Sequence, residues 1–351
     1  MNNNRIDLRS DTVTMPSEKM RAVIYDAKVG DQGYGEDEVT IELEQYCAQY
    51  FGKEDAVFMC SGTMSDQVAI RCWTNPGDEI ILDKSYHINY FQTGPSTDLG
   101  KILLNTCDTK DGILRVEDIE KAIKCRIRGD LFSKIGLISL ENTINGFGGS
   151  IYPIDILKEV YQFAKANNIP VHMDGERFLN ACIETGIDVK EYASYSDTIS
   201  TSFSKGLGAP FGSILMGSKE MMSKARKFRR WYGGSLHQSG FMASAALYAI
   251  KNNVERLQED NDNAKLLQKL LQENGEVNFE LGKVETNMVM IYTENLGINA
   301  QDFVEYCRNK NVMLYPWAEH TVRAVTNLNV SKDDIKIAAD RIIEVCIENK
   351  K

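Results

Sequence analysis

The sequence predicts an α/β fold with a mainly parallel sheet covered by helices on both faces, followed by a smaller α+β unit. Two observations predict this fold class. Short apolar segments recur along the first two thirds of the chain, separated by helical or loop segments, as in a parallel sheet that is buried on both faces. After residue 250 the pattern changes to charged amphipathic helices that alternate with strands. We therefore expect an N-terminal arm (1–15), a large domain (16–250) and a small C-terminal domain (251–351), which is reasonable for 351 residues.

The elements before the sheet can be taken in order. Residues 5–14 alternate between polar and apolar side chains and predict an extended arm. Pro16 suits the first turn of a helix that runs to Ile24. Residues 30–35 form a glycine-rich loop, and residues 36–51 return to helical spacing.

Seven apolar segments predict the strands of the sheet, and a helix over residues 154–167 has the clearest apolar face. The strands are expected at 56–60, 79–82, 102–104, 135–140, 170–173, 198–203 and 212–216. Catalytic groups in such sheets collect at the carboxyl ends of the strands. Ser61, Glu141, Asp174 and Lys205 all fall there.

The last hundred residues predict the smaller unit. Its elements are expected to be helices over 253–272, 300–310 and 332–348, with strands over 286–292, 312–314 and 322–326. We find no internal repeat and no low-complexity segment.

Charge and cysteine content exclude several classes of protein. A net charge of −10 argues against a nucleic-acid partner that is held by bulk electrostatics. Eight cysteines occur without any Cys-x-x-Cys pair, so neither a metal site nor a disulfide framework is indicated. A reduced, cytoplasmic setting fits best.

Neither of the two candidate segments favours a signal peptide or a membrane span. Residues 1–7 lack the apolar core of a signal peptide. Residues 231–250 carry no acidic residue, lysine or arginine, but they contain three glycines, His237 and Gln238. A buried helix or a subunit contact is the better interpretation of that segment.

Lys205 ends an apolar strand and is followed by Gly206 and Gly208. Because burying an ammonium group is costly, we expect Lys205 at the strand end, facing a cleft. There its amine can act as a nucleophile by forming a Schiff base. A strand-end lysine that points to water is the alternative, and taken alone it is the more common case.

Ser61, Gly62 and Thr63 follow the first strand of the sheet and open a helix. Free backbone N–H groups at a helix start, joined by two hydroxyls, can hold a phosphate. An ordinary helix cap by Ser61 or Thr63 is the alternative, and from this segment alone the cap is favoured.

Asp174 ends another strand, one helix and one strand before Lys205. A buried strand-end acid needs a cation, which is either Arg177 or a protonated ring nitrogen. A phosphate cradle, a strand-end acid and a strand-end lysine are together what pyridoxal 5'-phosphate needs. The combination, in this order along the chain, predicts that cofactor.

The sequence resembles the threonine aldolases of the β-eliminating lyase group, on the aspartate-aminotransferase-like fold (fold type I) of pyridoxal-phosphate enzymes. The matching segments are 7–14, 34–37, 61–64, 87–90, 141–143, 174–177, 204–210 and 322–326. The resemblance implies a lyase that cleaves a β-hydroxy-α-amino acid, such as threonine or allo-threonine, to glycine and an aldehyde. It also implies a homodimer or homotetramer with active sites shared across subunits.

The resemblance further implies roles for individual residues. Lys205, His87 and Asp174 are the expected catalytic residues, with His87 stacked on the pyridine ring. The expected cofactor-binding residues are Ser61, Gly62, Thr63, His87, Asp174, Arg177, Ser202, Lys205 and His237. The expected substrate-binding residues are Ser10, Tyr34, Arg177 and Arg323, of which Tyr34 would reach the pocket of a partner subunit.

Four positions depart from the family pattern. Ile144 stands where similar sequences carry a histidine that is assigned to the substrate hydroxyl, and His237 stands where an arginine reaches the phosphate. Asn327 replaces a common histidine, and Glu176 lies inside an Asp-Gly-Ala-Arg signature. The cofactor residues are therefore retained, while the groups expected near the β-carbon are altered.

Two other hypotheses stay open at this point. A racemase, a transaldolase or a β-eliminating enzyme on the same cofactor would tolerate Ile144. A nicotinamide-dependent oxidoreductase, or a binding protein without activity, would not need Lys205. Gly212 comes one residue too late after Gly206 and Gly208 for the dinucleotide-binding spacing.

Overall fold

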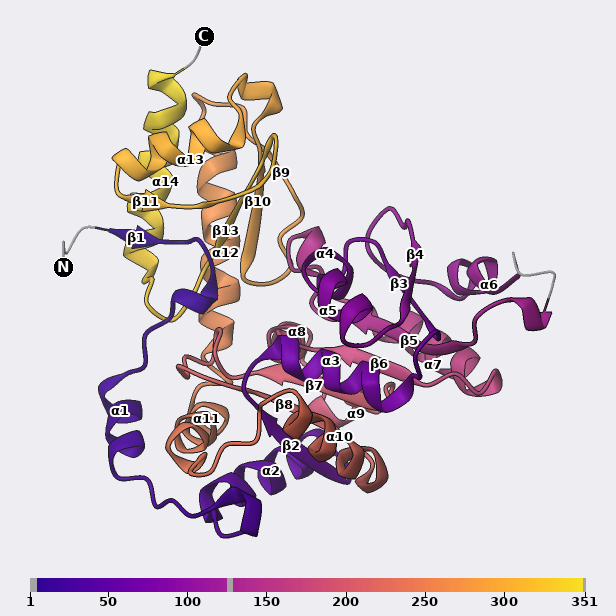
Figure 1. Ribbon diagram of the computed structural model, residues 1–351. Coiled ribbons are helices and arrows are strands. Elements are labelled where there is room, and N and C mark those ends of the chain that lie inside the picture. The colour runs from indigo at the N-terminus through magenta and orange to yellow at the C-terminus, as the bar shows by residue number, and fades with distance from the viewer. Residues whose placement is uncertain (1–4, 125–128, 350–351) are drawn as a thin grey trace.

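A computed structural model describes residues 5–124 and 129–349, and Figure 1 shows them as two bodies joined near the middle of the molecule. The expectations for residues 1–4, Cys125 and residues 350–351 lie outside these described residues.

The larger body is built on a seven-stranded sheet with the order β2-β8-β7-β6-β5-β3-β4. Its strands are β2 (Asp55–Met59), β3 (Glu79–Asp83), β4 (Leu103–Cys107), β5 (Ile135–Glu141), β6 (Val171–Asp174), β7 (Thr198–Ser202) and β8 (Ser213–Gly217). Only β8 runs antiparallel to its neighbours, and all other pairs in this sheet are parallel. The predicted mainly parallel sheet is therefore confirmed, although β4 starts and ends later than the sequence suggested.

Helices cover the sheet on both faces, since every residue of β3, β7 and β8 is buried. Helices α3 (Gly62–Trp73) and α10 (Lys219–Trp231) pack against β2 and β8, as does α2 (Glu38–Phe51). The helices of this body are α1 (Glu18–Tyr25), α2 (Glu38–Phe51), α3 (Gly62–Trp73), α4 (His87–Phe91), α5 (Thr93–Asp98), α6 (Val116–Lys124), α7 (Ile154–Ala166), α8 (Phe178–Thr185), α9 (Val189–Ala193), α10 (Lys219–Trp231) and α11 (Gly240–Asn252).

The smaller body has its own hydrophobic core and its own antiparallel sheet, with the order β12-β13-β10-β9. The strands of the smaller body are β9 (Glu280–Leu281), β10 (Met288–Tyr292), β11 (Val312–Met313), β12 (Tyr315–Ala318) and β13 (Thr321–Val325), of which β11 lies outside this sheet. Its helices are α12 (Leu257–Gln272), α13 (Ala300–Asn309) and α14 (Lys332–Glu348). The predicted α+β unit is thus present, and the sequence missed the short strands β9 and β12.

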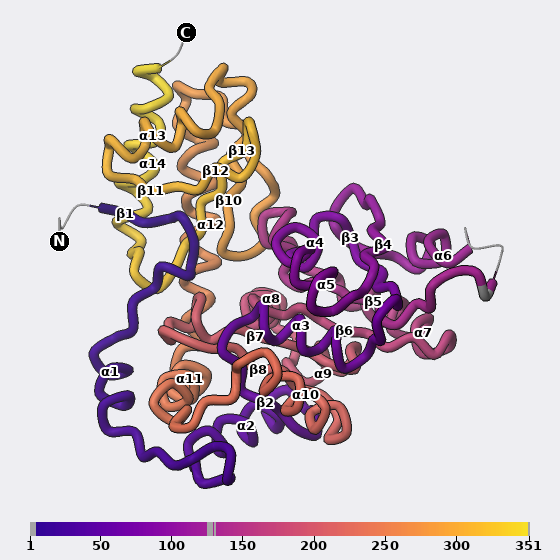
Figure 2. Tube along the Cα trace, in the orientation of Figure 1, coloured from indigo at the N-terminus to yellow at the C-terminus, as the bar shows by residue number. Residues whose placement is uncertain are grey.

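The N-terminal segment belongs to the smaller body by its contacts. Strand β1 (Ile6–Asp7) pairs in parallel with β11, and Ile6 and Leu8 are buried in the core of the smaller body. The chain then crosses to the larger body, where α1 packs on α11 (Figure 2). The segment joins both bodies.

The prediction for Pro16 is wrong in detail. Helix α1 begins at Glu18, and the side chain of Ser17 accepts a hydrogen bond from the Met20 N–H as its N-cap. Ser17 takes the start because its hydroxyl satisfies a free N–H of the first turn, which proline cannot do. Pro16 therefore stands before the helix.

Helix α11 explains the segment 231–250. Its buried face consists mainly of small residues, and it packs closely against α1 and α2. Within residues 5–124 and 129–349, no helix has both the length and the apolar character needed to cross a membrane.

Leu8→Ala should destabilise the protein, because Leu8 is fully buried in the smaller core. A buried Leu→Ala change costs about 2–5 kcal/mol of unfolding free energy. Urea denaturation followed by circular dichroism measures it. Met15→Ala is the control, since Met15 is 57% exposed. An unchanged midpoint for Leu8→Ala would show that the N-terminal segment is not part of the folded core.

Candidate active site

The carboxyl ends of three parallel strands bring the central acidic groups together. Glu141 at the end of β5 is paired with Asp174 at the end of β6. Asp174 is in turn paired with Ser200 of β7, and Lys205 follows β7 after a short turn. The parallel sheet thus places Asp174 and Lys205 at adjacent strand ends.

Asp174 is buried, and one of its carboxylate oxygens has no hydrogen-bond partner in the described chain. Its Oδ1 accepts from the Glu176 N–H at 3.3 Å. Burial, together with the neighbouring charges of Asp66 and Glu176, raises the pKa of Asp174 well above its usual value. A buried oxygen without a partner is costly, and a protonated ring nitrogen would satisfy Oδ2. Asp174 therefore fits the pyridine nitrogen of the predicted cofactor.

The alternative of an ion pair between Asp174 and Arg177 is wrong. Arg177 instead forms two hydrogen bonds with Asp11 of the N-terminal segment, at 2.7 and 2.6 Å. Burial acts to raise the pKa of Asp11, but Arg177 lowers it to about 2 overall. This buried pair fixes the guanidinium at the edge of the pocket.

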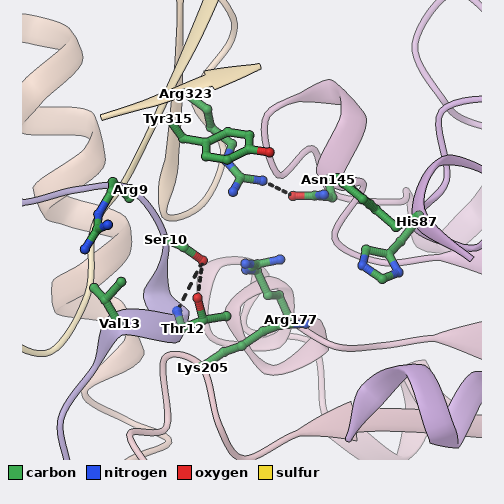
Figure 3. Close-up of a pocket in the computed structure, with 11 residues that line it drawn as sticks. Arg9, Ser10, Thr12, Val13, His87, Asn145, Arg177, Lys205, Tyr315 and Arg323 are labelled. Atoms are coloured by element: carbon green, nitrogen blue, oxygen red, sulfur yellow. Dashed lines mark hydrogen bonds between the residues drawn. The ribbon is translucent and has the colours of Figure 1, made fainter. Parts of the chain in front are cut away.

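A pocket of about 370 Å³ opens between the two bodies (Figure 3). Ser10 lines it from the N-terminal segment, His87 and Lys205 line it from the larger body, and Arg323 lines it from β13 of the smaller body. Arg177 also lines it. Five of the residues predicted from the sequence therefore share one cavity, although they come from three parts of the chain.

His87 is the first residue of α4, and its ring is held by a hydrogen-bond chain. Gln67 donates to the Gln92 Oε1 at 2.9 Å, and the Gln92 amide nitrogen lies 2.8 Å from the His87 Nδ1. Because an amide NH₂ only donates, Nδ1 accepts and the ring proton lies on Nε2. Burial, and then the charge of Lys205, lowers the pKa of His87 to about 4. His87 is therefore a neutral ring with its N–H at Nε2.

Arg323 is largely buried and retains an unused donor. Its Nη1 donates to the Asn145 Oδ1 at 2.8 Å, while its Nε has no partner in the described residues. Trp317 and Tyr315 of β12 lie against its guanidinium, with ring centroids 4.8 and 5.3 Å from Cζ. Burial lowers the pKa of Arg323 to about 10, so it stays charged at neutral pH. It can receive a carboxylate.

The helix that follows β2 starts as the sequence predicted. Helix α3 begins at Gly62, and Ser61 caps it by accepting from the Met64 N–H. The cap and a phosphate site are compatible, since the Ser61 hydroxyl can still donate. Ser202, at the end of β7, is buried and accepts from the Ser204 N–H at 3.2 Å.

Glu176 lies between this helix start and Lys205. Its Oε2 is 2.8 Å from the Lys205 Nζ. The sequence identified Glu176 only as a departure from a family signature, and nothing in its spacing indicated this contact.

Asp66 on α3 is a further residue that the sequence did not single out. It is fully buried, accepts from Ser200 and Gln92, and lies with His87 and Asp174 in a group whose ligand atoms are within 4.8 Å of one another. Burial and the charge of Glu176 raise the pKa of Asp66 to about 7. One feature of the sequence could have identified Asp66, because it is a lone acidic residue on the apolar face of a helix.

The remaining predicted residues lie outside this pocket. Tyr34 is 84% exposed, and the His237 side chain is 80% exposed and pairs with Asp31 at 2.9 Å. Ile144 is fully buried in the larger core, and the next residue, Asn145, lines the pocket instead. The structure of one chain therefore does not bring Tyr34 or His237 to Lys205.

Three features define the class of protein. They are a mainly parallel sheet, a lysine that follows the carboxyl end of one strand, and a buried aspartate at the same edge with one oxygen that has no partner among the described residues. The chain belongs to the beta-eliminating lyase family, whose model matches residues 7–295. This confirms the resemblance found in the sequence, and with it the prediction that the chain is a lyase of this group.

Two relatives and one solved structure are similar to this chain over nearly its whole length. A low specificity L-threonine aldolase of Escherichia coli K12 is 38% identical, covering 94% of this chain and 96% of the relative. An uncharacterized protein of Caenorhabditis elegans is 37% identical, covering 97% and 82%. The solved structure of Leishmania major threonine aldolase has a TM-score of 0.82 at 19% identity, covering 98% and 99%, and supports the fold.

Asp11→Asn should strongly destabilise the protein at neutral pH, by about 3–5 kcal/mol, because Arg177 would be left buried without a counter-charge. The lowered pKa of Asp11 means that its contribution is complete above its unfolded pKa near 4 and is lost as the pH falls towards about 2. Urea unfolding between pH 7 and pH 2 should show a steeper loss for the wild type than for the variant.

Asp7→Asn is the matched control, because Asp7 pairs with Arg9 at a partly exposed site. Its cost should stay below about 1 kcal/mol. Equal losses for both variants would contradict the special role of the buried pair.

Proposed function

We propose that the chain is a pyridoxal 5'-phosphate-dependent aldolase that cleaves a β-hydroxy-α-amino acid of the threonine or allo-threonine type to glycine and an aldehyde. The observation that carries the proposal is the buried, unpartnered Oδ2 of Asp174 beside Lys205 at adjacent strand ends. The family assignment and the name of the E. coli relative support it.

Different residues would bind different parts of the cofactor. When bound, pyridoxal phosphate supplies an electron-accepting ring that stabilises negative charge at the substrate Cα. Asp174 would keep the ring nitrogen protonated, and Lys205 would supply the amine that links the protein to the cofactor. The α3 start with Ser61, Gly62 and Thr63 would hold the phosphate, with Ser202 near the end of β7.

Recognition of the substrate carboxylate falls to Arg323. Arg177 already donates two hydrogen bonds to Asp11, whereas the Arg323 Nε has no partner among the described residues. A guanidinium binds a carboxylate through two parallel hydrogen bonds. Ser10 lines the same pocket and can donate its hydroxyl.

The proton of the substrate β-hydroxyl needs an acceptor other than residue 144. Ile144 has no acceptor, and its side chain is fully buried. His87 carries its ring proton at Nε2 because Gln92 donates to Nδ1, so Nε2 acts as a donor. We therefore assign proton removal to the Lys205 amine or to a water molecule, and the orientation of the hydroxyl to His87.

A second candidate, a racemase, a transaldolase or a β-eliminating enzyme on the same cofactor, is favoured by the same Ile144. Racemisation and β-elimination begin with removal of the Cα proton, so neither depends on a histidine at that position, whereas a transaldolase would still need an acceptor for the β-hydroxyl proton. Exchange of the Cα hydrogen for deuterium without formation of aldehyde would select it.

The proposal extends to the assembly of the chain with further copies and to its location in the cell. Tyr34 and His237 lie on exposed segments of one chain, which suits residues that serve the pocket of a second copy in a homodimer or homotetramer. We propose a cytoplasmic setting, because every described cysteine is free. The partners are a small amino acid and further copies of the chain, without nucleic acid or membrane.

Lys205→Ala should lose both the covalent link to the cofactor and the formation of glycine. Asp174→Asn should retain cofactor but lose at least about 100-fold in rate, because the ring nitrogen would lose its counter-charge. Absorbance and mass spectrometry of products from a panel of β-hydroxy amino acids measure these effects. Cofactor that stays attached to denatured Lys205→Ala after borohydride reduction would contradict the proposed linkage, and no aldehyde from any substrate would reject the aldolase.

Arg323→Lys should raise KM by about 10-fold with a smaller change in kcat, because a lysine cannot offer two parallel donors. Arg9→Lys is the matched control, since Arg9 lines the same pocket but is 41% exposed and paired with Asp7. Equal effects of both changes would refute the assignment of the carboxylate to Arg323.

A further inference from the structure

The carboxylate of Glu176 lies directly against the start of α3. A Cβ atom placed on Gly62 would be only 2.3 Å from the Glu176 Oε2 and 2.5 Å from Oε1. Gly62 is the first residue of this twelve-residue helix. Only a glycine leaves room for the carboxylate at this place.

Three positive or donor groups surround this carboxylate. The Lys205 Nζ is 2.8 Å from Oε2, and the Ser213 hydroxyl is 3.2 Å from Oε1. The N-terminal end of α3 adds the positive end of the helix dipole. Burial acts to raise the pKa of Glu176, but Lys205 and the hydrogen bonds lower it overall, so the group is a carboxylate.

The same surroundings are what a phosphate monoester and an aldehyde require. A phosphate binds at a helix start with hydroxyl donors, and the aldehyde must reach the Lys205 amine. The Glu176 carboxylate contacts both the start of α3 and the Lys205 amine. Independently, the buried Oδ2 of Asp174, which has no partner among the described residues, marks the far end of the ring site.

We propose that Glu176 competes with the cofactor phosphate for the start of α3 and thereby sets the affinity of the protein for its cofactor. The proposal rests on the proposed function. Binding of the cofactor requires the Glu176 side chain to leave Gly62 and Lys205, because two anions cannot share one helix start without strong repulsion. Glu176 is thus a residue of the chain itself that competes with the cofactor phosphate.

Glu176→Gln and Glu176→Ala test the proposal. Each full-length variant is freed of cofactor by dialysis and titrated with pyridoxal phosphate, and binding is followed by visible absorbance. Both variants should bind at least about 10-fold more tightly than the wild type, which corresponds to about 1.4 kcal/mol. Glu176→Ala, which removes the side chain as well as the charge, should bind at least as tightly as Glu176→Gln.

Pyridoxal, which lacks the phosphate, separates the two contacts of Glu176. Its affinity should rise less than that of pyridoxal phosphate, and inorganic phosphate should compete better with pyridoxal phosphate in both variants. Glu220→Gln is the matched control, because it removes one negative charge at a side chain that is 75% exposed. Melting curves by circular dichroism establish that both variants fold.

The outcomes are distinct. Unchanged or weaker binding of pyridoxal phosphate in both variants would overturn the proposal, as would an equal gain for pyridoxal. A wild type and variants that all bind neither compound would instead reject the proposed function.

Discussion

The parallel pairing of β6 with β7 is the constraint on which the site depends. It fixes Asp174 opposite Ser200, so that the chain leaving β7 must carry Lys205 past the carboxyl end of β6. A lysine and an aspartate that are separated in sequence by α8, α9 and β7 thus lie next to each other without any direct bond between them. The sheet, rather than an ion pair, sets their spacing.

The second constraint is the balance of buried charge at this edge. The carboxyl groups outnumber the cations in the described site, and burial raises the pKa of Asp66, Glu141 and Asp174. The acids are Asp11, Asp66, Glu141, Asp174 and Glu176, and the cations are Arg177, Lys205 and Arg323. A cationic ring nitrogen would relieve this excess, whereas a phosphate would add to it at the place where Glu176 already lies. The two ends of the proposed cofactor would therefore meet opposite electrostatic conditions.

Sequence reasoning predicted the features that depend on local order. Strands, the helix after Ser61, and the order of Asp174 and Lys205 follow from apolar runs and from residue types at their ends. It could not predict the partner of Arg177, because Asp11 comes from a segment 166 residues away in sequence. The antiparallel direction of β8 was also beyond it, since a buried strand reads the same in either direction.

Tyr34 and His237 show a different limit. Their segments lie together, since the Gln32 N–H donates to the His237 carbonyl and His237 pairs with Asp31. Both are exposed, and neither is among the residues that line the pocket of their own chain. A single chain contains no information on which surface a second copy covers, so a role in a shared site depends on association.

The position of the pocket between two cores has a mechanical consequence. Arg323 belongs to the smaller body, yet it bonds to Asn145 of the larger one, and Asp11 connects Arg177 with Asn287 across the same boundary. Trp317 of the smaller body also stacks on Tyr90 of the larger one, with ring centroids 5.4 Å apart. Because Arg323 and Lys205 are anchored in different cores, a substrate held by both must bring the two bodies to one fixed separation. The hydrogen bonds across the boundary hold that separation before any substrate arrives, so less ordering is left for the binding step.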